Sequence, residues 1–179
     1  MDATLQHGLR PAVVPQLKTI TVGGAASGLG IESSSFKFGL VHETVEQMEI
    51  LLGDGRLVRC SCRENRDLFF GFPNSYGTLG YALRLTVRLI PAKPCVHLSH
   101  TRFPDPESYF ARVQEVCAEG RADYLDGTIF SSEELYLTEA TFVDQAPSLS
   151  ASTYMDIYYR HIPPLAQDAP PHKLALLRS

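Results

Sequence analysis

The chain has 179 residues, a length that suits one domain, or one domain with a piece of another. Its 44% hydrophobic and 20% charged residues are ordinary values for a globular protein. The net charge of −4 excludes a general attraction to nucleic acid or to acidic lipid. No run approaches the ~20 apolar residues that span a bilayer, and the N-terminal residues do not resemble a signal peptide. We therefore expect no nucleic-acid partner, no membrane segment and no secretion.

The composition also suggests a compartment and a source. Cysteines occur at positions 60, 62, 95 and 117, in a scatter that indicates neither a disulfide framework nor a zinc site. We expect buried free thiols, with Cys60 and Cys62 on one face of a strand. Arginine outnumbers lysine twelve to four, which is typical of a GC-rich bacterial genome. These features together predict a cytoplasmic, bacterial protein.

A glycine-rich stretch at residues 21–33 dominates the first third of the chain. Residues 1–8 suggest the end of a helix closed by Gly8, and the alternation at residues 17–20 predicts a short strand that enters the stretch. Glycines at 23, 24, 28 and 30 would let backbone N–H groups converge on a phosphate or pyrophosphate. A glycine-rich surface loop without a ligand has the same composition, and weak helical periodicity follows, so this is not the Rossmann fingerprint.

The middle of the chain predicts a small antiparallel sheet. Residues 45–59 read as a hairpin that turns at Gly-Asp-Gly, and residues 64–71 read as one helical turn. A second glycine-bearing turn occupies residues 73–80. The strand that follows, residues 81–90, alternates apolar and polar side chains and predicts that Tyr81, Leu83, Leu85, Val87 and Leu89 share one face. Considered without its neighbours, the sequence of residues 73–80 indicates a tight turn that leads into an edge strand.

Prolines at residues 91–94 indicate a boundary, after which a second pattern begins. Residues 96–103 predict a strand, residues 107–119 an amphipathic helix capped by Gly120, and residues 124–130 and 134–142 two further strands. This order is that of a ferredoxin-like α+β layer. From residue 162 the chain is proline-rich and aperiodic, so we expect a disordered or aberrant tail over residues 161–179.

Short motifs along residues 2–160 resemble those of the vanillyl-alcohol-oxidase-type (PCMH-type) FAD flavoproteins. They are Thr-Val-Gly-Gly at 21–24, Gly-Leu-Gly-Ile-Glu-Ser-Ser-Ser at 28–35, Phe-Gly at 38–39, Gly-Asp-Gly at 53–55, Glu-Asn at 64–65, Asp-Leu-Phe at 67–69, Tyr-Gly-Thr-Leu-Gly at 76–80 and Ile-Pro-Ala-Lys at 90–93. Within that superfamily the sequence looks most like the delta-24 sterol reductase (diminuto/seladin) branch, for which the Gly-Ile-Glu-Ser-Ser-Ser run is characteristic.

The resemblance implies an α+β fold and a domain plan. Residues 1–92 would be the central part of a PCMH-type FAD-binding domain, and residues 93–160 the start of a ferredoxin-like substrate (cap) domain. In the resembled family a βαβ subdomain comes first and holds the FAD pyrophosphate from the other side. We therefore expect the chain to be a fragment, completed by a longer chain, a homo-oligomer or a partner chain.

The resemblance also implies that the FAD pyrophosphate lies against the first glycine-rich stretch, and that the second turn supports the adenosine half. The implied cofactor-binding residues are Thr21, Val22, Gly23, Gly24, Ala25, Ala26, Ser27, Gly28, Leu29, Gly30, Ile31, Glu32 and Ser33, with Gly77 and Gly80. Because its charge would repel a phosphate, we expect Glu32 to cap neighbouring N–H groups or to meet a ribose hydroxyl.

The implied function is FAD-dependent oxidoreduction of a small molecule. The sterol reductase branch implies hydride transfer through the flavin and reduction of a C=C bond of a sterol-like substrate, with NADPH as the electron donor. Oxidation of an alcohol or hydroxy acid is the alternative reaction, and a truncated chain that does not retain FAD is the alternative of a different class. No catalytic residue or metal ligand is assigned. His97 and His100 are expected to be surface or hydrogen-bonded histidines.

Overall fold

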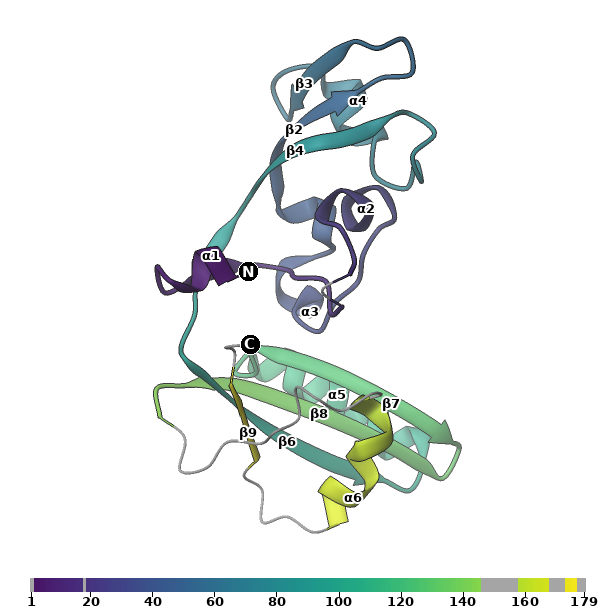
Figure 1. Cartoon of the computed structure of the whole chain (residues 1–179). Coiled ribbons are helices and arrows are strands. Elements are labelled where there is room, and N and C mark those ends of the chain that lie inside the picture. The colour runs from purple at the N-terminus through teal and green to yellow at the C-terminus, as the bar shows by residue number, and fades with distance from the viewer. Residues whose placement is uncertain (1, 18, 146–157, 168–172, 177–179) are drawn as a thin grey trace. The chain divides into compact units, whose positions relative to one another are not determined.

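The computed structural model describes residues 2–17, 19–145, 158–167 and 173–176. The chain forms two compact units, Leu9–Ile90 and Met1–Gly8 together with Pro91–Ser179. Helices and antiparallel strands occur in both units, which confirms the α+β class (Figure 1). None of the described helices is long and apolar enough to cross a membrane.

The unit Leu9–Ile90 is built on a three-stranded antiparallel sheet with the order β3-β2-β4. Its strands are β2 (Val45–Leu51), β3 (Leu57–Ser61) and β4 (Tyr81–Val87). The helical segments are α2 (Val22–Ser27), α3 (Ser35–Phe38), the 3-10 turn η1 (Val41–Thr44) and α4 (Arg66–Gly71). A pair of short strands, β1 (Leu9–Pro11) and β5 (Leu89–Pro91), closes the unit.

The hairpin and the helical turn that follows it are confirmed. Strands β2 and β3 pair from Gln47 opposite Ser61 to Leu51 opposite Leu57. The turn has Gly55 at φ +86°, a left-handed conformation that glycine adopts without strain. The larger buried cluster of this unit lies between the hairpin and α4, and consists of Val45, Met48, Ile50, Cys60, Phe69 and Phe72. A second cluster joins Val13, Ala25 and Val41.

Strand β4 exists as predicted, but its expected apolar face is wrong. The β2–β4 register shifts between Glu49 and Ile50, so that Arg84 opposes Glu49 and Ala82 opposes Ile50. Leu83 is therefore the extra residue of a β-bulge, and the alternation of faces breaks there. Tyr81 and Leu83 are 71% and 60% exposed, whereas Ala82, Leu85 and Val87 pack on the core.

The second unit begins with the short helix α1 (Asp2–Leu5), which ends near Gly8 at φ +67° as expected. Its main body runs β6 (Cys95–Phe103), α5 (Pro106–Glu119), β7 (Tyr124–Ser131) and β8 (Glu134–Val143). This confirms the predicted strand, helix, strand, strand order. Asp105 caps α5 by accepting the Ser108 N–H at 2.8 Å, and Gly120 at φ +65° ends it.

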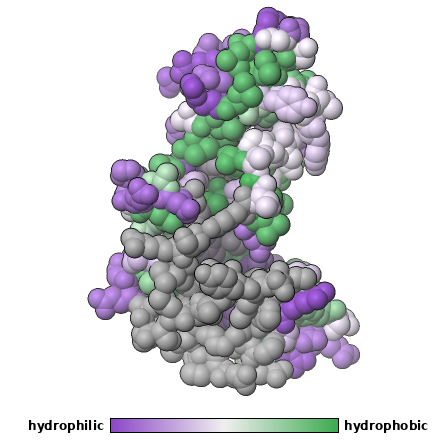
Figure 2. Space-filling view, viewed as in Figure 1, coloured by the Kyte–Doolittle hydropathy of each residue, from purple (hydrophilic) through white to green (hydrophobic). Residues whose placement is uncertain are grey.

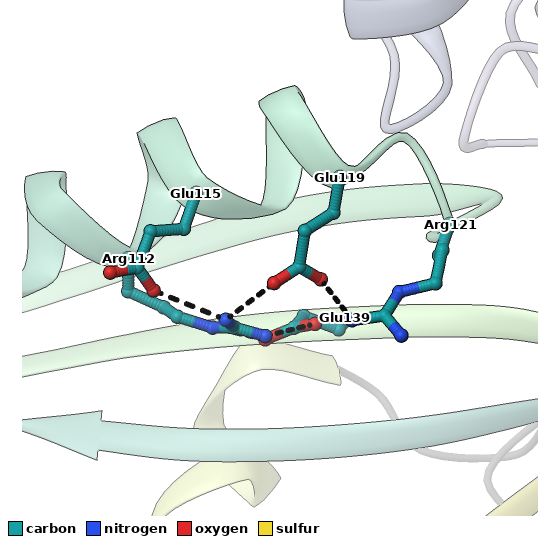
Figure 3. Close-up of polar contacts among 5 residues, drawn as sticks. All are labelled: Arg112, Glu115, Glu119, Arg121 and Glu139. Carbon is teal, nitrogen blue, oxygen red and sulfur yellow. Dashed lines mark hydrogen bonds and ion pairs between the residues drawn. The ribbon is translucent and has the colours of Figure 1, made fainter.

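A four-stranded antiparallel sheet with the order β7-β8-β6-β9 supports this unit. Helix α5 contacts β8 and β6 along one face of the sheet (Figure 1). Side chains from α5 and β8 also form the ionic cluster of Arg112, Glu115, Glu119 and Glu139, which Arg121 joins through Glu119 (Figure 3).

The tail differs from the expectation where the structure describes it. Residues Tyr158–His161 form the 3-10 turn η3, Ile162–Gln167 form α6, and Lys173–Leu176 form β9. Strand β9 pairs with the free edge of β6, from Cys95 opposite Leu176 to Leu98 opposite Lys173, and Ile162 is buried. An aperiodic segment can gain structure in this way because an existing sheet edge offers backbone partners.

The cysteines divide evenly between the interior and the surface. Cys60 and Cys95 are buried, as expected, whereas Cys62 and Cys117 are exposed, and all four are free thiols. The expectation that Cys60 and Cys62 share a strand face is wrong because β3 ends at Ser61. Burial, with the nearby Glu64 charge, raises the pKa of the Cys60 thiol, so Cys60 serves as a small apolar core residue.

Candidate functional site

The first part of the glycine-rich stretch is a helix rather than a loop. Thr21 has an extended backbone, and its Oγ1 accepts the Gly24 N–H at 3.0 Å, so Thr21 caps α2. Residues 17, 19 and 20 are not a strand, contrary to the expectation. Only Ala25 and Ala26 of α2 are buried. A helix whose buried face is two alanines has no apolar periodicity in its sequence, which is why the pattern suggested a loop.

Helix α2 lies very close to the first part of β4. A Cβ at Gly23 would come within 3.2 Å of the Ala82 carbonyl oxygen, a distance tighter than ordinary packing. On the other side of the stretch, a Cβ at Gly30 would come within 3.0 Å of Val41 Cγ2. At least these two glycines are thus required by packing within the unit, and they need no ligand to account for them.

The structure brings the two predicted glycine-bearing segments together. The Tyr76 N–H donates to the Ser27 carbonyl oxygen at 3.2 Å, which joins the second turn to the last residue of α2. In the same turn, Gly80 has φ +136°, and a Cβ there would collide with the Leu51 carbonyl oxygen. Gly77, at φ +85°, has open space around its Cβ position. Gly80 therefore fits the turn to the sheet, while Gly77 leaves the surface beside α2 free of a side chain.

Three non-glycine residues adopt a left-handed backbone in this region, one of them Asn74 (φ +63°), a residue type that tolerates it. Leu29 has φ +55° in the first segment, and Tyr76 has φ +49° in the second. Such conformations are uncommon outside glycine, Asn and Asp and often occur at functional sites. Sequence reasoning singled out the neighbouring glycines and missed Tyr76, whose backbone makes the link. The Tyr-Gly-Thr-Leu-Gly motif at 76–80 includes Tyr76, but its residue type does not reveal the link, because Tyr76 acts here through its backbone N–H.

The end of the stretch is fixed by short polar side chains. Glu32 Oε2 accepts the Gln16 N–H at 3.0 Å, and the Glu32 N–H donates to Ser35 Oγ at 3.0 Å. Ser34 is buried, and its hydroxyl donates to the Ala12 carbonyl oxygen at 2.9 Å. The Glu32 carboxylate thus caps a backbone N–H group, as expected.

The surface next to the two segments is apolar. Tyr76 is 73% exposed, and Val22, Leu79, Tyr81 and Leu83 are also exposed. Figure 2 shows hydrophobic surface on the visible side of this unit, in the region where β2, β3 and β4 lie in Figure 1. In the first turn of α2 the Gly24 and Ala25 N–H groups bond to Thr21 Oγ1 and to the Thr21 carbonyl oxygen, whereas those of Val22 and Gly23 lie before the first carbonyl group that the helix could offer them. The arrangement therefore offers anion-binding backbone groups beside apolar surface.

Other chemistry receives no support from the described residues. Among them, no group of three His, Cys, Asp or Glu side chains could hold a metal ion. His100 Nδ1 lies 2.8 Å from Thr138 Oγ1, so His100 is a hydrogen-bonded histidine, as expected. Lys37, which follows the glycine-rich stretch, is exposed and its Nζ lies 5.8 Å from the centre of the Phe36 ring.

Comparisons with known proteins indicate a family that binds FAD. A family model described as an FAD binding domain matches residues 1–61. The chain is 35% identical over 154 residues to the Delta(24)-sterol reductase of Homo sapiens, covering 84% of this chain and 30% of that protein. It is 45% identical over 98 residues to the enzyme of the same name from Pisum sativum, covering 54% of this chain and 17% of that protein. Cytokinin dehydrogenase 4 of Oryza sativa is 34% identical over 131 residues, covering 72% of this chain and 25% of that protein.

These relatives correct the expected source. The sterol reductases that match come from mammals and plants, so they point to a eukaryotic protein, and the bacterial, cytoplasmic assignment is wrong. A high ratio of arginine to lysine reflects base composition and is a weak guide to lineage. The chain spans about 30% of the length of the mammalian reductases it matches.

Proposed function

Since the chain belongs to the PCMH-type FAD flavoproteins, we propose that it is part of an FAD-dependent oxidoreductase. In this proposal residues 21–33, with Gly77 and Gly80, hold the pyrophosphate and adenosine part of FAD. The observation that carries the proposal is the hydrogen bond from the Tyr76 N–H to the Ser27 carbonyl oxygen. It unites two segments at one surface, through residues about 50 positions apart in the sequence.

The residues present suit an FAD pyrophosphate. The start of α2 supplies the backbone N–H groups of Val22 and Gly23, and no lysine or arginine lies between Lys18 and Lys37. The Ser27 hydroxyl donates to the Gly24 carbonyl oxygen at 3.3 Å and would leave that bond to meet an anion. An anion here would be held by backbone dipoles rather than by side-chain charges. The exposed apolar side chains nearby suit the uncharged ring systems at either end of the cofactor.

We propose reduction of a C=C bond in a small, sterol-like molecule as the reaction of the whole protein, with NADPH as the electron donor. FAD, when bound, supplies hydride transfer, while the protein binds and orients the substrate. The proteins named as Delta(24)-sterol reductases support this direction. The unit Pro91–Ser179 would contribute to the substrate domain.

Oxidation of a small molecule is the second candidate reaction. It is favoured by one observation, the similarity of this chain to Cytokinin dehydrogenase 4 of Oryza sativa over 72% of its length. Both reactions use the same FAD site, so they differ only in substrate and in the direction of hydride transfer. Anaerobic incubation of the FAD-loaded whole protein with NADPH separates them, since bleaching of the flavin absorbance supports reduction and an unchanged spectrum supports oxidation.

A pair of matched glycine variants tests the cofactor site. Gly77 and Gly55 have almost the same φ, +85° and +86°, and a Cβ at either position meets nothing within 4 Å. Gly77→Ala and Gly55→Ala should therefore impose the same backbone strain, about 1–2 kcal/mol. Only Gly77→Ala places a methyl group at the proposed cofactor surface.

We expect Gly77→Ala to weaken FAD binding roughly tenfold, as for a loss of about 1.4 kcal/mol, and Gly55→Ala to leave it unchanged. Titration of each full-length variant with FAD, followed by flavin fluorescence, measures this difference. Equal affinities in the two variants would show that the second glycine-bearing turn does not contact FAD.

A further inference from the structure

An open pocket of about 530 Å³ lies between the β2–β3 hairpin and α4, and it shares no residue with the proposed cofactor site. Its volume is within the range of small-molecule sites in proteins. Three apolar and four polar side chains line it. Among them, Asn65, Asp67 and Leu68 belong to the Glu-Asn and Asp-Leu-Phe motifs of residues 64–69, to which the proposed function gives no role.

The apolar floor of the pocket, formed by Leu52, Val58 and Leu68, continues the core of the unit. All three side chains are half-buried, and Leu52 and Leu68 pack on the cluster between the hairpin and α4. Val58 pairs with Ile50, which is fully buried. A carbon body that entered the pocket would cover the exposed part of these side chains, which is favourable because it removes further apolar surface from water.

The polar walls of the pocket are held by the protein itself. Asn65 precedes α4 with a left-handed backbone (φ +46°), and its side chain does not cap the helix. Its Nδ2 donates to the Arg59 carbonyl oxygen at 2.7 Å, which ties the start of α4 to β3 (Figure 1). In the hairpin turn, Arg56 Nε donates to Asp54 Oδ2 at 2.7 Å. A ligand therefore meets walls that are already ordered, which lowers the cost of binding.

The rim of the pocket carries charges of both signs. The Arg66 guanidinium carbon lies 5.7 Å from the centre of the Phe70 ring, one turn further along α4. Among the described residues, neither Arg66 nor Asp67 forms a side-chain hydrogen bond or an ion pair. Arg56 uses its Nε for Asp54, and no described residue bonds to its Nη groups. The rim thus presents guanidinium donors and a carboxylate acceptor to a ligand.

The opposite charges of adjacent residues select the class of ligand. A simple anion is attracted by Arg66 and repelled by Asp67, and for a simple cation the two effects are reversed. The two arginines and two aspartates at the pocket sum to zero, so the site favours no net charge. A zwitterion can satisfy both signs, and an α-amino acid carries its ammonium and carboxylate groups on the same carbon atom.

We propose that this pocket binds an α-amino acid with an apolar side chain. The Arg66 guanidinium donates to the carboxylate of the ligand, and Asp67 accepts a hydrogen bond from its ammonium group. The apolar side chain of the ligand packs on the apolar floor. Because the pocket lies within the unit Leu9–Ile90 and apart from residues 21–33, it is a second ligand site of the protein.

Four small probes test the proposal on the full chain. L-Leucine carries both charges, 4-methylpentanoate lacks the ammonium group, 3-methylbutylamine lacks the carboxylate, and glycine lacks the apolar side chain. Each probe is titrated at neutral pH into isotopically labelled protein without FAD, and the backbone amide shifts are followed by NMR. We expect L-leucine to shift the amides of Leu52 and residues 65–68 saturably, and to bind about fivefold more tightly than each of the other three probes.

Variants of the two charged residues assign the two ends of the ligand. Arg66→Gln should abolish the preference for L-leucine over 3-methylbutylamine and keep the preference over 4-methylpentanoate. Asp67→Asn should do the opposite. Arg63→Gln is the matched control and should behave as wild type, because Arg63 is also exposed but does not line the pocket. All three side chains are exposed, so these variants should fold, and the dispersion of their amide spectra checks this.

The wild-type titrations alone can overturn the proposal. Equal or tighter binding of 4-methylpentanoate would identify a site for simple anions, and the same result for 3-methylbutylamine would identify a site for simple cations. Equal binding of glycine, or the absence of saturable shifts with L-leucine, would also contradict it. FAD is absent from these titrations, so their outcome does not depend on the proposed function.

Discussion

Arg112 of α5 binds Glu139 of β8 through three hydrogen bonds that hold the helix on the sheet (Figure 3). The Nε–Oε1, Nη2–Oε1 and Nη2–Oε2 distances are 3.0, 2.9 and 3.0 Å. The two side chains are only 31% and 24% exposed, so solvent screens this pair less than a surface ion pair. The same guanidinium also contacts Glu115 and Glu119 of its own helix.

We expect Arg112→Gln to lower the free energy of unfolding by about 1–3 kcal/mol, because it leaves Glu139 with a partly buried, unpaired charge. The matched control is Arg121→Gln. Arg121 is 80% exposed and pairs with Glu119, so its loss should change stability by less than about 0.5 kcal/mol. Urea denaturation followed by circular dichroism measures both variants. A similar effect for the two would mean that the Arg112–Glu139 pair does not anchor α5.

Gly127 in β7 leaves room for the Tyr109 side chain of α5. A Cβ at Gly127 would collide with the Tyr109 hydroxyl oxygen, and Tyr109 itself is buried against Phe103. We expect Gly127→Ala to destabilise the protein by about 1–3 kcal/mol through this overlap. Adding Tyr109→Phe should restore part of that loss, although Tyr109→Phe alone should not stabilise. Thermal denaturation of the two single variants and the double variant measures the coupling, and purely additive effects would rule out the clash.

The cap of α2 offers a test of the local geometry at the candidate site. Thr21→Ala removes the acceptor for the Gly24 N–H, which should weaken the short helix by about 1 kcal/mol. We expect faster hydrogen exchange at the Gly24 amide and FAD binding that is several-fold weaker. Thr21→Ser keeps a hydroxyl at the same position and should behave as wild type. Unchanged exchange at Gly24 in Thr21→Ala would show that residue 21 does not cap α2.

The half-buried carboxyl of Asp126 should make stability depend on pH. Because burial raises its pKa in the folded state, the unfolded chain loses this proton first as pH rises. The contribution of Asp126 to the free energy of unfolding is therefore fully present below the ordinary aspartate pKa of about 3.9. It is lost as the pH rises through the pKa that Asp126 has in the folded protein. His100, Arg102, Glu134 and Tyr136 share its sheet face, and Tyr136 donates to Glu134.

We expect Asp126→Asn to become more stable relative to wild type as pH rises from about 4, and the difference to level off once Asp126 is ionised. Urea unfolding of both proteins at a series of pH values gives this difference directly. A difference that is constant, or that shrinks as pH rises, would show that the Asp126 carboxyl is not desolvated in the folded protein.

Strong local signals made the regular elements of the fold predictable. The β2–β3 hairpin has an Asp-Gly turn between apolar runs, and α5 has Asp105 and Gly120 at its ends, so short-range chemistry fixes both. Helices α2 and α3 were not predictable in this way, because they are short and depend on packing between distant residues. The bulge at Leu83 and the pairing of β9 with β6 likewise depend on partners far along the chain.

The candidate site was predictable in outline only. Both glycine-bearing segments could be located from the sequence, and so could the capping role of Glu32. The contact that joins them through Tyr76 and Ser27 could not be predicted, because a backbone hydrogen bond does not depend on the side chains of the two residues. The packing roles of Gly23 and Gly30 also appear only when the neighbouring Ala82 and Val41 are in place.

The central claim is that the surface formed by residues 21–33 and the turn bearing Gly77 holds FAD. The most direct measurement is the visible absorbance spectrum of the purified full chain after incubation with FAD and gel filtration, with Gly77→Ala and Gly55→Ala alongside. The account predicts flavin absorbance that elutes with wild type and with Gly55→Ala, and is reduced for Gly77→Ala. A folded wild-type chain that elutes without flavin, or three proteins that retain it equally, would contradict the claim.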